Sequence, residues 1–288
     1  MRIVSLLPSA TEIVYALGLD DQLMGVTDEC DSPAAARGKR VVVRSRQPAG
    51  LTPAEIDVWV RTEAPNGGLY RLDDAAIAEI SPQLLLTQDL CRVCAVPTGD
   101  VDAALDRIGC EADVLTLEPQ RLGDVLLSVA EVAAAAGEPD RGRELVNVLS
   151  GRLEAVRSAV GGRTPVPTLV LEWLDPPFTA GHWVPDVIAA AGGEPLLGEP
   201  GRASRPSTWD DVLRTDPEVV VLAPCGVPSA DALLLAEDLV PTELLTRRVV
   251  AVDLARPGPR LVDAVEALAA FLHPDAGLPR PPNVLLWR

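Results

Sequence analysis

The chain has few cations, few aromatic side chains and only two histidines, and these shortages exclude several classes of function. Lys and Arg number 25 against 42 Asp and Glu, which gives a formal net charge of −17. Surfaces that bind nucleic acid or anionic membranes need clustered cations, so this balance favours a small-molecule ligand and no nucleic-acid partner. Five Trp, two Tyr and two Phe are the whole aromatic content, and two of the Trp residues stand in motifs discussed below.

Long apolar runs and a recognisable export signal are also missing. No segment approaches the roughly 18 consecutive apolar residues that a membrane span needs. The start, MRIVSLLPSATEIVYALG, has no basic region, no long apolar stretch and no small-x-small cleavage site. We therefore expect a cytoplasmic protein without a membrane span, and docking to a transporter is not expected of a protein that is not exported.

Several catalytic motifs are absent as well. The sequence has no phosphate-binding loop, no Gly-x-Gly-x-x-Gly after the first strand, no Gly-x-Ser-x-Gly and no His-Glu-x-x-His. Nucleotide cofactors and serine hydrolysis lose support accordingly. Catalytic residues stay unknown, and whether the chain is an enzyme stays open.

Short apolar runs alternate with helical patterns, which predicts an α/β fold with parallel sheets. The length of 288 residues favours two lobes. We predict an N-terminal α/β lobe over residues 1–120, a helical segment over 121–162 with a long bridging helix from about Asp140, and a C-terminal α/β lobe over 163–288. The predicted architecture is two Rossmann-like lobes joined by that helix, with a ligand cleft between the lobes. Ser9 and Glu12 form a capping-box pattern that predicts a helix start at Ser9.

Polar side chains follow several predicted strands at the point where each strand ends. Cys30 follows the second strand, the Cys91-x-x-Cys94 pair follows LLLTQ, Glu172 and Trp173 end TLVLEW, and Cys225 follows VVVLAP. In an open parallel sheet, ligands bind outside the carboxyl ends of the strands. These residues are therefore candidates for a binding site.

The cysteines allow more than one interpretation. In a reducing compartment a Cys-x-x-Cys pair indicates metal binding or redox activity before a structural disulfide. A single pair is only a moderate zinc signal, which becomes stronger if Cys30 and either Cys225 or His182 converge on it. The competing interpretation is that free Cys packs as a small buried apolar side chain, and this is the favoured interpretation for Cys110.

His182, in the loop AGHWVP, is a candidate metal ligand or general acid/base. The alternative is a histidine stacked on Trp183 and hydrogen-bonded to a carbonyl. Asp28 and Glu29 flank Cys30 and either bind a polar ligand or are solvated loop acids. Arg260 either binds a ligand carboxylate or phosphate, or forms a surface ion pair.

The motifs SLLPSATE, GVTDECD, LTQDLCRVCAV, LEWLDPPFTAGHWVPDVIAAAGG, VVVLAPCG and RPGPRLVD resemble the helical-backbone, or class III, substrate-binding proteins. Within that family they look like the cobalamin-binding branch, which is related to the periplasmic receptors of vitamin importers. The resemblance covers nearly the whole chain and implies a two-lobed binder of a corrinoid, a haem or another chelated metal. It implies ligand contacts from Pro8, Ser9, Asp28, Glu29, Cys30, Gln88, Asp89, Cys91, Cys94, Glu172, Trp173, His182, Trp183, Cys225 and Arg260.

Two main functions follow from these observations. The first is a cytosolic carrier or sensor that binds cobalamin or a related tetrapyrrole, with Trp173 and Trp183 stacked on the ligand and an axial ligand from His182 or a cysteine. The second is a metalloenzyme in which Cys30, Cys91, Cys94 and Cys225 or His182 hold zinc, iron or an iron–sulfur cluster. Glu29 or Glu172 would then be the general base.

Overall fold

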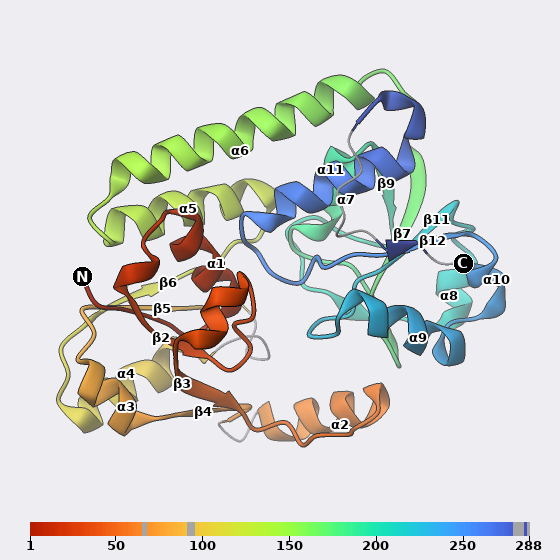
Figure 1. Ribbon diagram of the computed structural model, residues 1–288. Coiled ribbons are helices and arrows are strands. Elements are labelled where there is room, and N and C mark those ends of the chain that lie inside the picture. The colour runs from red at the N-terminus through yellow and green to blue at the C-terminus, as the bar shows by residue number, and fades with distance from the viewer. Residues whose placement is uncertain (65–67, 91–95, 279–284, 287–288) are drawn as a thin grey trace. The chain divides into compact units, whose positions relative to one another are not determined.

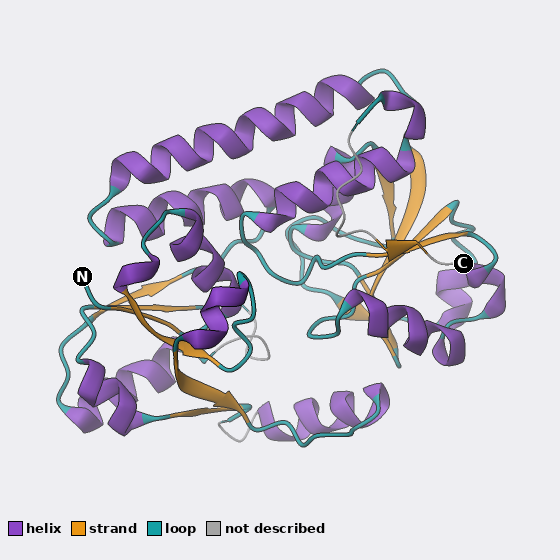
Figure 2. Cartoon of the chain, in the orientation of Figure 1, coloured by secondary structure: helices purple, strands orange, loops and turns teal. Residues whose placement is uncertain are grey.

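The computed structural model describes residues 1–64, 68–90, 96–278 and 285–286. The chain divides into two compact units, each with a β-sheet flanked by helices (Figures 1 and 2). Unit 1 comprises Met1–Pro119 and Leu126–Asn147, and unit 2 comprises Gln120–Val125 and Val148–Arg288. Helices α5 (Leu122–Ala135) and α6 (Pro139–Val160) contribute residues to both units. The 22-residue α6 confirms the long helix, whereas the three predicted domain boundaries stay predictions.

The sheet of unit 1 has the strand order β4-β3-β2-β1-β5-β6. Its strands are β1 (Ile3–Ser5), β2 (Leu23–Thr27), β3 (Arg40–Ser45), β4 (Tyr70–Leu72), β5 (Leu84–Thr87) and β6 (Asp113–Thr116). Its further helices are α1 (Pro8–Ala16), α2 (Pro53–Glu63), α3 (Asp74–Ile80) and α4 (Thr98–Ile108), with short 3-10 turns at Asp20–Gln22 and Ala34–Gly38. All neighbouring strands are parallel except β4, which is antiparallel to β3.

The sheet of unit 2 has the order β10-β8-β7-β11-β12-β13, and β9 pairs with β7. Its strands are β7 (Val166–Leu174), β8 (Pro177–Thr179), β9 (Gly193–Leu196), β10 (Arg205–Pro206), β11 (Val219–Leu222), β12 (Arg248–Ala251) and β13 (Leu285–Leu286). Its further helices are α7 (Val184–Ala190), α8 (Trp209–Leu213), α9 (Ser229–Leu239), α10 (Thr242–Leu245) and α11 (Arg260–Leu272), with a 3-10 turn at Pro274–Ala276. Strands β9, β7, β11 and β12 are parallel, and β8, β10 and β13 pair antiparallel.

The α/β architecture is confirmed, but both sheets are mixed rather than all parallel. The antiparallel strands β4, β8, β10 and β13 have only two or three residues each, too few to produce an apolar run that sequence analysis detects. The predicted capping box at Ser9 is wrong. Helix α1 begins one residue earlier with Pro8, and Ser9 is buried inside the helix, because proline is favoured at the first helical position.

None of the helices in the described part of the chain is both long enough and apolar enough to cross a membrane.

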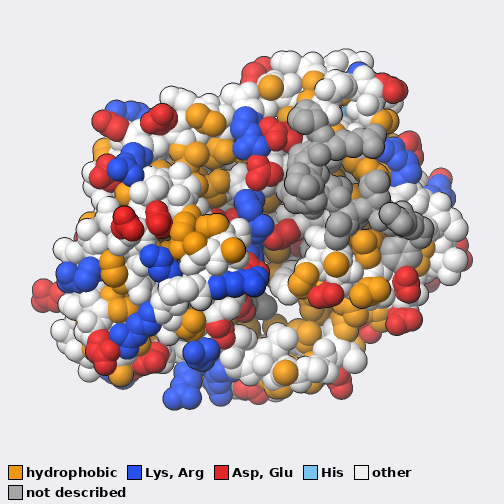
Figure 3. All heavy atoms as spheres, viewed as in Figure 1, with side chains coloured by type: hydrophobic (Ala, Val, Ile, Leu, Met, Phe, Trp, Pro, Cys, Tyr) orange, Lys and Arg blue, Asp and Glu red, His pale blue; other side chains and the backbone are white. Residues whose placement is uncertain are grey.

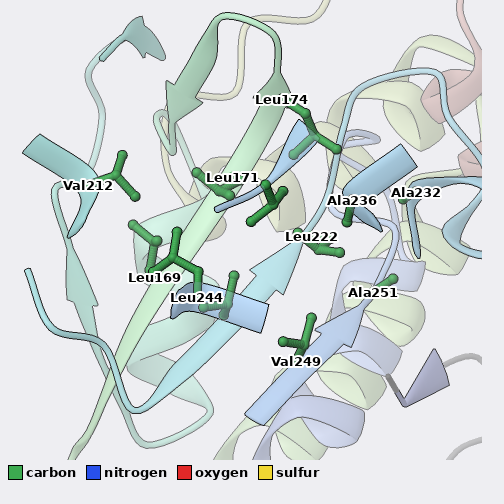
Figure 4. Close-up of a cluster of buried hydrophobic side chains, with 12 residues drawn as sticks. Leu169, Leu171, Leu174, Val212, Leu222, Ala232, Ala236, Leu244, Val249 and Ala251 are labelled. Carbon is green, nitrogen blue, oxygen red and sulfur yellow. The ribbon is translucent and has the colours of Figure 1, made fainter. Parts of the chain in front are cut away.

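The core of unit 2 explains why the sequences of its central strands are continuous apolar runs. Leu169 and Leu171 of β7, Leu222 of β11 and Ala251 of β12 are fully buried and pack under α8, α9 and α10 (Figure 4). Strands of a parallel sheet are covered on both faces, so almost every position is apolar. The register pairs Leu171 with Leu222 and Leu222 with Ala251, which places the carboxyl ends of the three strands at one edge.

Leu171→Ala should lower the free energy of unfolding by about 2–5 kcal/mol, because it removes a fully buried side chain and leaves a cavity. Leu234→Ala is the matched control, since Leu234 is 64% exposed on α9 of the same unit, and it should change stability by no more than about 0.5 kcal/mol. Urea denaturation of both variants measures this. Equal losses would show that the core has been assigned to the wrong face.

Candidate functional site

Residues from three strands of unit 2 meet at the carboxyl edge of its sheet. Glu172 lies near the end of β7, Cys225 follows β11, and Asp253 and Leu254 follow β12. The Cys225 N–H donates to the Glu172 carbonyl oxygen at 3.2 Å. This edge is where a parallel sheet offers a binding site, and two of the candidate residues are neighbours there.

The half-buried carboxylate of Glu172 joins two loops to β7. Its Oε1 accepts a hydrogen bond from Gly181 N at 3.1 Å, and its Oε2 accepts one from the Ser204 hydroxyl. Both carboxylate oxygens therefore have protein donors. This makes Glu172 a positioning residue for the loops that carry His182 and Arg202.

Gly181 is required by close packing rather than by its backbone angles. A Cβ at this position would lie 2.5 Å from the Arg202 carbonyl oxygen and closer still to Ser204 N. Real side chains cannot occupy that space, so any other residue would push the two loops apart. The glycine in the sequence Gly-His-Trp is thus explained by the contact between the two loops.

His182 is held in one orientation by its backbone and its ring. It has φ = 49°, its N–H donates to Arg202 O at 2.6 Å, and its carbonyl accepts from Gly201 N at 3.0 Å. Its Nδ1 lies 3.2 Å from Gln120 Oε1, and the ring stacks on Trp183 with centroids 5.7 Å apart. With an oxygen as the partner, Nδ1 carries the proton and Nε2 keeps its lone pair. Burial lowers the pKa of His182 below its usual 6.5, which favours the neutral imidazole.

The two predicted aromatic contacts have different environments. Trp183 is only 6% exposed, and its indole N–H donates to Leu254 O at 2.8 Å. Trp173 is half-buried and donates to Asp175 O at 3.0 Å. Trp183 is therefore a buried support on which the His182 ring stacks. The Trp173 side chain is more exposed and has more surface that a ligand could contact. Ligand stacking by either ring stays a prediction.

Three residues that sequence analysis did not identify help to build this site: Gln120, Ser204 and Arg121. Arg121 forms a two-pronged ion pair with Asp186 at 2.6 and 2.7 Å, and Leu122 N donates to the same carboxylate. This hydrogen bonding raises the pKa of Arg121 above its ordinary value. The pair fastens residues 120–122 to the start of α7, beside His182. Since Gln120 and His182 are 62 positions apart, no local sequence pattern could have linked them.

Arg260 forms an ion pair with Asp253 at 3.1 Å, with both side chains about two-fifths exposed. This is the surface-pair alternative that the sequence left open. An exposed pair of this kind contributes little to stability. A role of Arg260 in ligand binding stays a prediction.

In unit 1, the candidate residues after β2 separate into buried and exposed ones. Cys30 is 3% exposed, and its Sγ lies 3.1 Å from Thr11 Oγ1 and 3.4 Å from Thr27 Oγ1. Ser9, which follows β1 and lies in α1, is buried as well, at 3% exposure. Asp28 and Glu29 are exposed, and Asp28 Oδ1 accepts from Ser45 N at 3.2 Å. Among these candidates, only the two acids present their side chains to solvent.

The residues after β5 are Gln88, which is 3% exposed, and Asp89, which is exposed. Asp89 Oδ1 accepts from Thr98 N at 2.7 Å, so it supports the start of α4. Asp89 also lines a surface depression of about 680 Å³ bounded by β4 and by the starts of α3 and α4. The depression includes none of the other candidate residues in the described ranges.

Only part of the predicted metal site lies within the described residues. Cys91 and Cys94 lie outside the described residues. In the described ranges, Cys30 and Cys225 form no disulfide and lie in different units, and no three His, Cys, Asp or Glu side chains are grouped to hold a metal ion. A site that includes Cys91 and Cys94 stays a prediction.

Each of the two mixed α/β units carries polar loops at the carboxyl edge of its sheet, the edge at which parallel sheets bind ligands. The sequence matches the model of the periplasmic binding protein family over residues 3–251, and the chain belongs to that family. This confirms the resemblance that the sequence motifs indicated.

Comparisons with individual proteins agree with this assignment. The chain is similar to a vitamin B12-binding protein of Vibrio cholerae, with 23% identity over 279 residues, 94% of this chain and 88% of the relative. It is also similar to an uncharacterised ABC transporter substrate-binding lipoprotein of Bacillus subtilis, with 24% identity over 95% of this chain and 80% of the relative. Among solved structures, a periplasmic haem-binding protein of Pseudomonas aeruginosa superposes with a TM-score of 0.75 at 19% identity, covering 100% of this chain and 98% of the other. At that identity the similarity establishes the fold.

Gly181→Ala should lower the free energy of unfolding by about 1–3 kcal/mol, since the methyl group has no room between the two loops. Gly151→Ala is the matched control: Gly151 lies inside α6 with nothing near its Cβ position. There the substitution should stabilise by about 0.5–1 kcal/mol. Thermal denaturation of both variants checks this, and equal effects would contradict the packing argument.

His182 should make stability fall in mild acid. The folded state disfavours the imidazolium, so below pH 6.5 the unfolded chain binds more protons than the folded one. The contribution of neutral His182 to the free energy of unfolding is fully present above pH 6.5. It is lost as pH falls from 6.5 through the lowered pKa of His182 in the folded state. His182→Asn, chosen because Asn tolerates positive φ, should flatten this part of the pH profile of the unfolding free energy. An unchanged profile in the variant would show that His182 does not titrate in this way.

Proposed function

We propose that this protein binds a metal-containing tetrapyrrole, a corrinoid or a haem, with His182 Nε2 as a ligand to the central metal. The observation that carries the proposal is the environment of His182. Its imidazole is kept neutral by burial, its Nδ1 proton faces Gln120 Oε1, and its Nε2 lone pair has no hydrogen-bond partner among the described residues.

This arrangement is the one that metal-binding histidines use. A metal ligand must be deprotonated at the donor nitrogen, and its other ring N–H is almost always held by an oxygen acceptor. Gln120 supplies that acceptor, and Trp183 holds the ring plane through stacking. The loop is also held by contacts within the protein, because Glu172 bonds to both Gly181 and Ser204. A fixed donor loses little entropy on binding.

The comparisons support the choice of ligand class. Relatives are named vitamin B12-binding proteins, and solved structures of the same fold are named periplasmic haem-binding proteins. Both ligands are planar, largely apolar macrocycles with a metal that accepts an axial nitrogen. The half-buried ring of Trp173, near the end of β7, offers such a macrocycle an apolar face.

The cellular role is proposed on the sequence alone. A cytosolic carrier or sensor is the role we propose, and separation of cytosolic from exported protein by cell fractionation would check it. The alternative function is a zinc, iron or iron–sulfur enzyme built on Cys30, Cys91, Cys94 and Cys225. The binding experiment described next distinguishes this enzyme from a tetrapyrrole-binding protein.

Absorbance titration of the purified protein with haem and with cobalamin tests the proposal. Wild type should bind at least one of them with a shifted visible spectrum. Gln120→Ala should weaken binding about 10- to 100-fold, because it removes the acceptor that orients the ligand histidine, and His182→Asn should abolish the spectral shift. His273→Gln is the matched control, since the other histidine of the chain is buried against the Gly192 carbonyl, and it should keep wild-type binding.

Two results would contradict the proposal. One is uptake of neither macrocycle together with stoichiometric zinc or iron that is lost in Cys91→Ser, which would favour the metalloenzyme. The other is a wild-type spectral shift that persists in His182→Asn, which would remove His182 from the metal.

A further inference from the structure

The chain segments that carry Gln120 and His182 are joined at a second point. Gln120 Oε1 lies 3.2 Å from His182 Nδ1, and the next residue, Arg121, forms the two-pronged ion pair with Asp186 at 2.6 and 2.7 Å. Asp186 lies in the first turn of α7, four residues after His182. Two contacts between the same two segments fix both their separation and their relative rotation, whereas a single contact would leave a pivot.

The backbone around Arg121 is held as closely as its side chain. Gln120 N and Arg121 N both donate to Asp124 Oδ2, at 3.0 and 2.8 Å, and Leu122 N donates to Asp186 Oδ2 at 3.1 Å. Two carboxylates thus bind three successive N–H groups at the start of α5, where the helix has unpaired donors and a positive dipole end. All five residues belong to unit 2, so the segment has a defined place within that unit.

An ion pair alone would not single out Arg121, because ion pairs are common on this protein. Figure 3 shows Lys and Arg side chains interspersed with Asp and Glu side chains on the surface. Exposed pairs contribute little to stability, and the Arg121 side chain is about half exposed. The Arg121–Asp186 pair differs in its place, because it adjoins the side chain that faces the His182 ring. We therefore expect it to affect the position of Gln120 more than the stability of the fold.

The aliphatic stem of Arg121 has a packing partner of its own. A Cβ at Gly201 would lie 3.0 Å from Arg121 Cδ, and Gly201 N donates to His182 O at 3.0 Å. The stem and the guanidinium of Arg121 therefore contact different neighbours, and a variant can remove one contact while it keeps the other. Methionine is suited to this, because it retains most of the apolar stem and lacks the guanidinium.

We propose that Arg121 is a positioning residue of the ligand site, which holds Gln120 so that its Oε1 faces His182 Nδ1. The inference rests on the proposed function for the role of His182 as a metal ligand. It adds that the Arg121–Asp186 pair sets how tightly the macrocycle is bound, although neither side chain is placed against the ligand. A histidine whose Nδ1–H is held by an acceptor presents its lone pair on Nε2, whereas a neutral histidine without that acceptor can adopt either tautomer.

A first experiment follows the ring nitrogens of His182 by NMR of ¹⁵N-labelled protein without any macrocycle. At about pH 8 the neutral imidazole predominates. The chain has only two histidines, so His273→Gln assigns the signals. Wild type should show a protonated Nδ1 and an unprotonated Nε2, and Arg121→Met should shift both nitrogens toward a mixture of tautomers. Unshifted nitrogens in Arg121→Met would overturn the proposal.

Arg107→Met is the matched control for this experiment. Arg107 forms a similar two-pronged pair with Asp74 at 3.0–3.3 Å, but it does so in unit 1. Its loss should leave the His182 nitrogens unchanged, and equal shifts in both variants would contradict a specific role of Arg121. Should Arg121→Met fail to fold, Arg121→Lys takes its place, because lysine keeps the charge without the planar fork. The same shifts of the His182 nitrogens are expected for it.

A second experiment links the positioning role to the ligand through a double-mutant cycle, measured by absorbance titration with haem and with cobalamin. Arg121→Met should weaken binding about 3- to 10-fold, less than Gln120→Ala, because the acceptor is displaced rather than removed. The double variant Gln120→Ala/Arg121→Met should bind no more weakly than Gln120→Ala, since a residue that acts through Gln120 then has nothing left to position.

Additive losses in the cycle would overturn the proposal, because they would show that Arg121 acts on binding without Gln120. Failure of wild type to bind either macrocycle would refute the proposed function instead. The nitrogen shifts of His182 would then decide the positioning role by themselves, since they are measured without a ligand.

Discussion

The carboxylate of Glu172 is the interaction on which the proposed site of unit 2 depends. It accepts from Gly181 N on one loop and from Ser204 on another, and so joins both to the end of β7. Because Gly181 has no side chain, the loops approach closely enough for Arg202 O to accept the His182 N–H. The position of the His182 ring follows from this contact. A carboxylate that strand position alone would assign to ligand or base chemistry serves here to hold a neighbour in place.

The charged side chains near the sheet edges are compensated to different degrees in the two units. In unit 2, ionic groups near the site are satisfied internally: Arg121 by Asp186, and Arg260 by Asp253. The half-buried group that burial keeps uncharged is His182. In unit 1, Arg44 and Arg71 stay opposite each other without an acid among the described residues.

Much of the architecture was predictable because it depends on local patterns. The apolar runs of β1, β2, β5, β7, β11 and β12 are buried strands, and the helical periodicity after Asp140 is α6. The placement of Glu172 and Cys225 at one sheet edge followed from strand ends alone. The helix start at Ser9 was wrong, because Pro8 begins the helix earlier. The short antiparallel strands β4, β8, β10 and β13 escaped detection, because pairing across the sheet, and not their composition, makes them strands.

By itself, the sequence determined the α/β class, the family and the edges of the sheets where polar side chains gather, since these follow from hydrophobic periodicity and strand direction. Only the tertiary structure decided what those side chains do. It showed Trp183 buried against Leu254 O, Cys30 enclosed by two threonines, Gln120 beside His182, and Arg71 opposite Arg44. Apart from Thr27, which is three residues before Cys30, each of these contacts joins residues far apart in the chain. Sequence spacing carries no information about them, because packing and strand register set their distances.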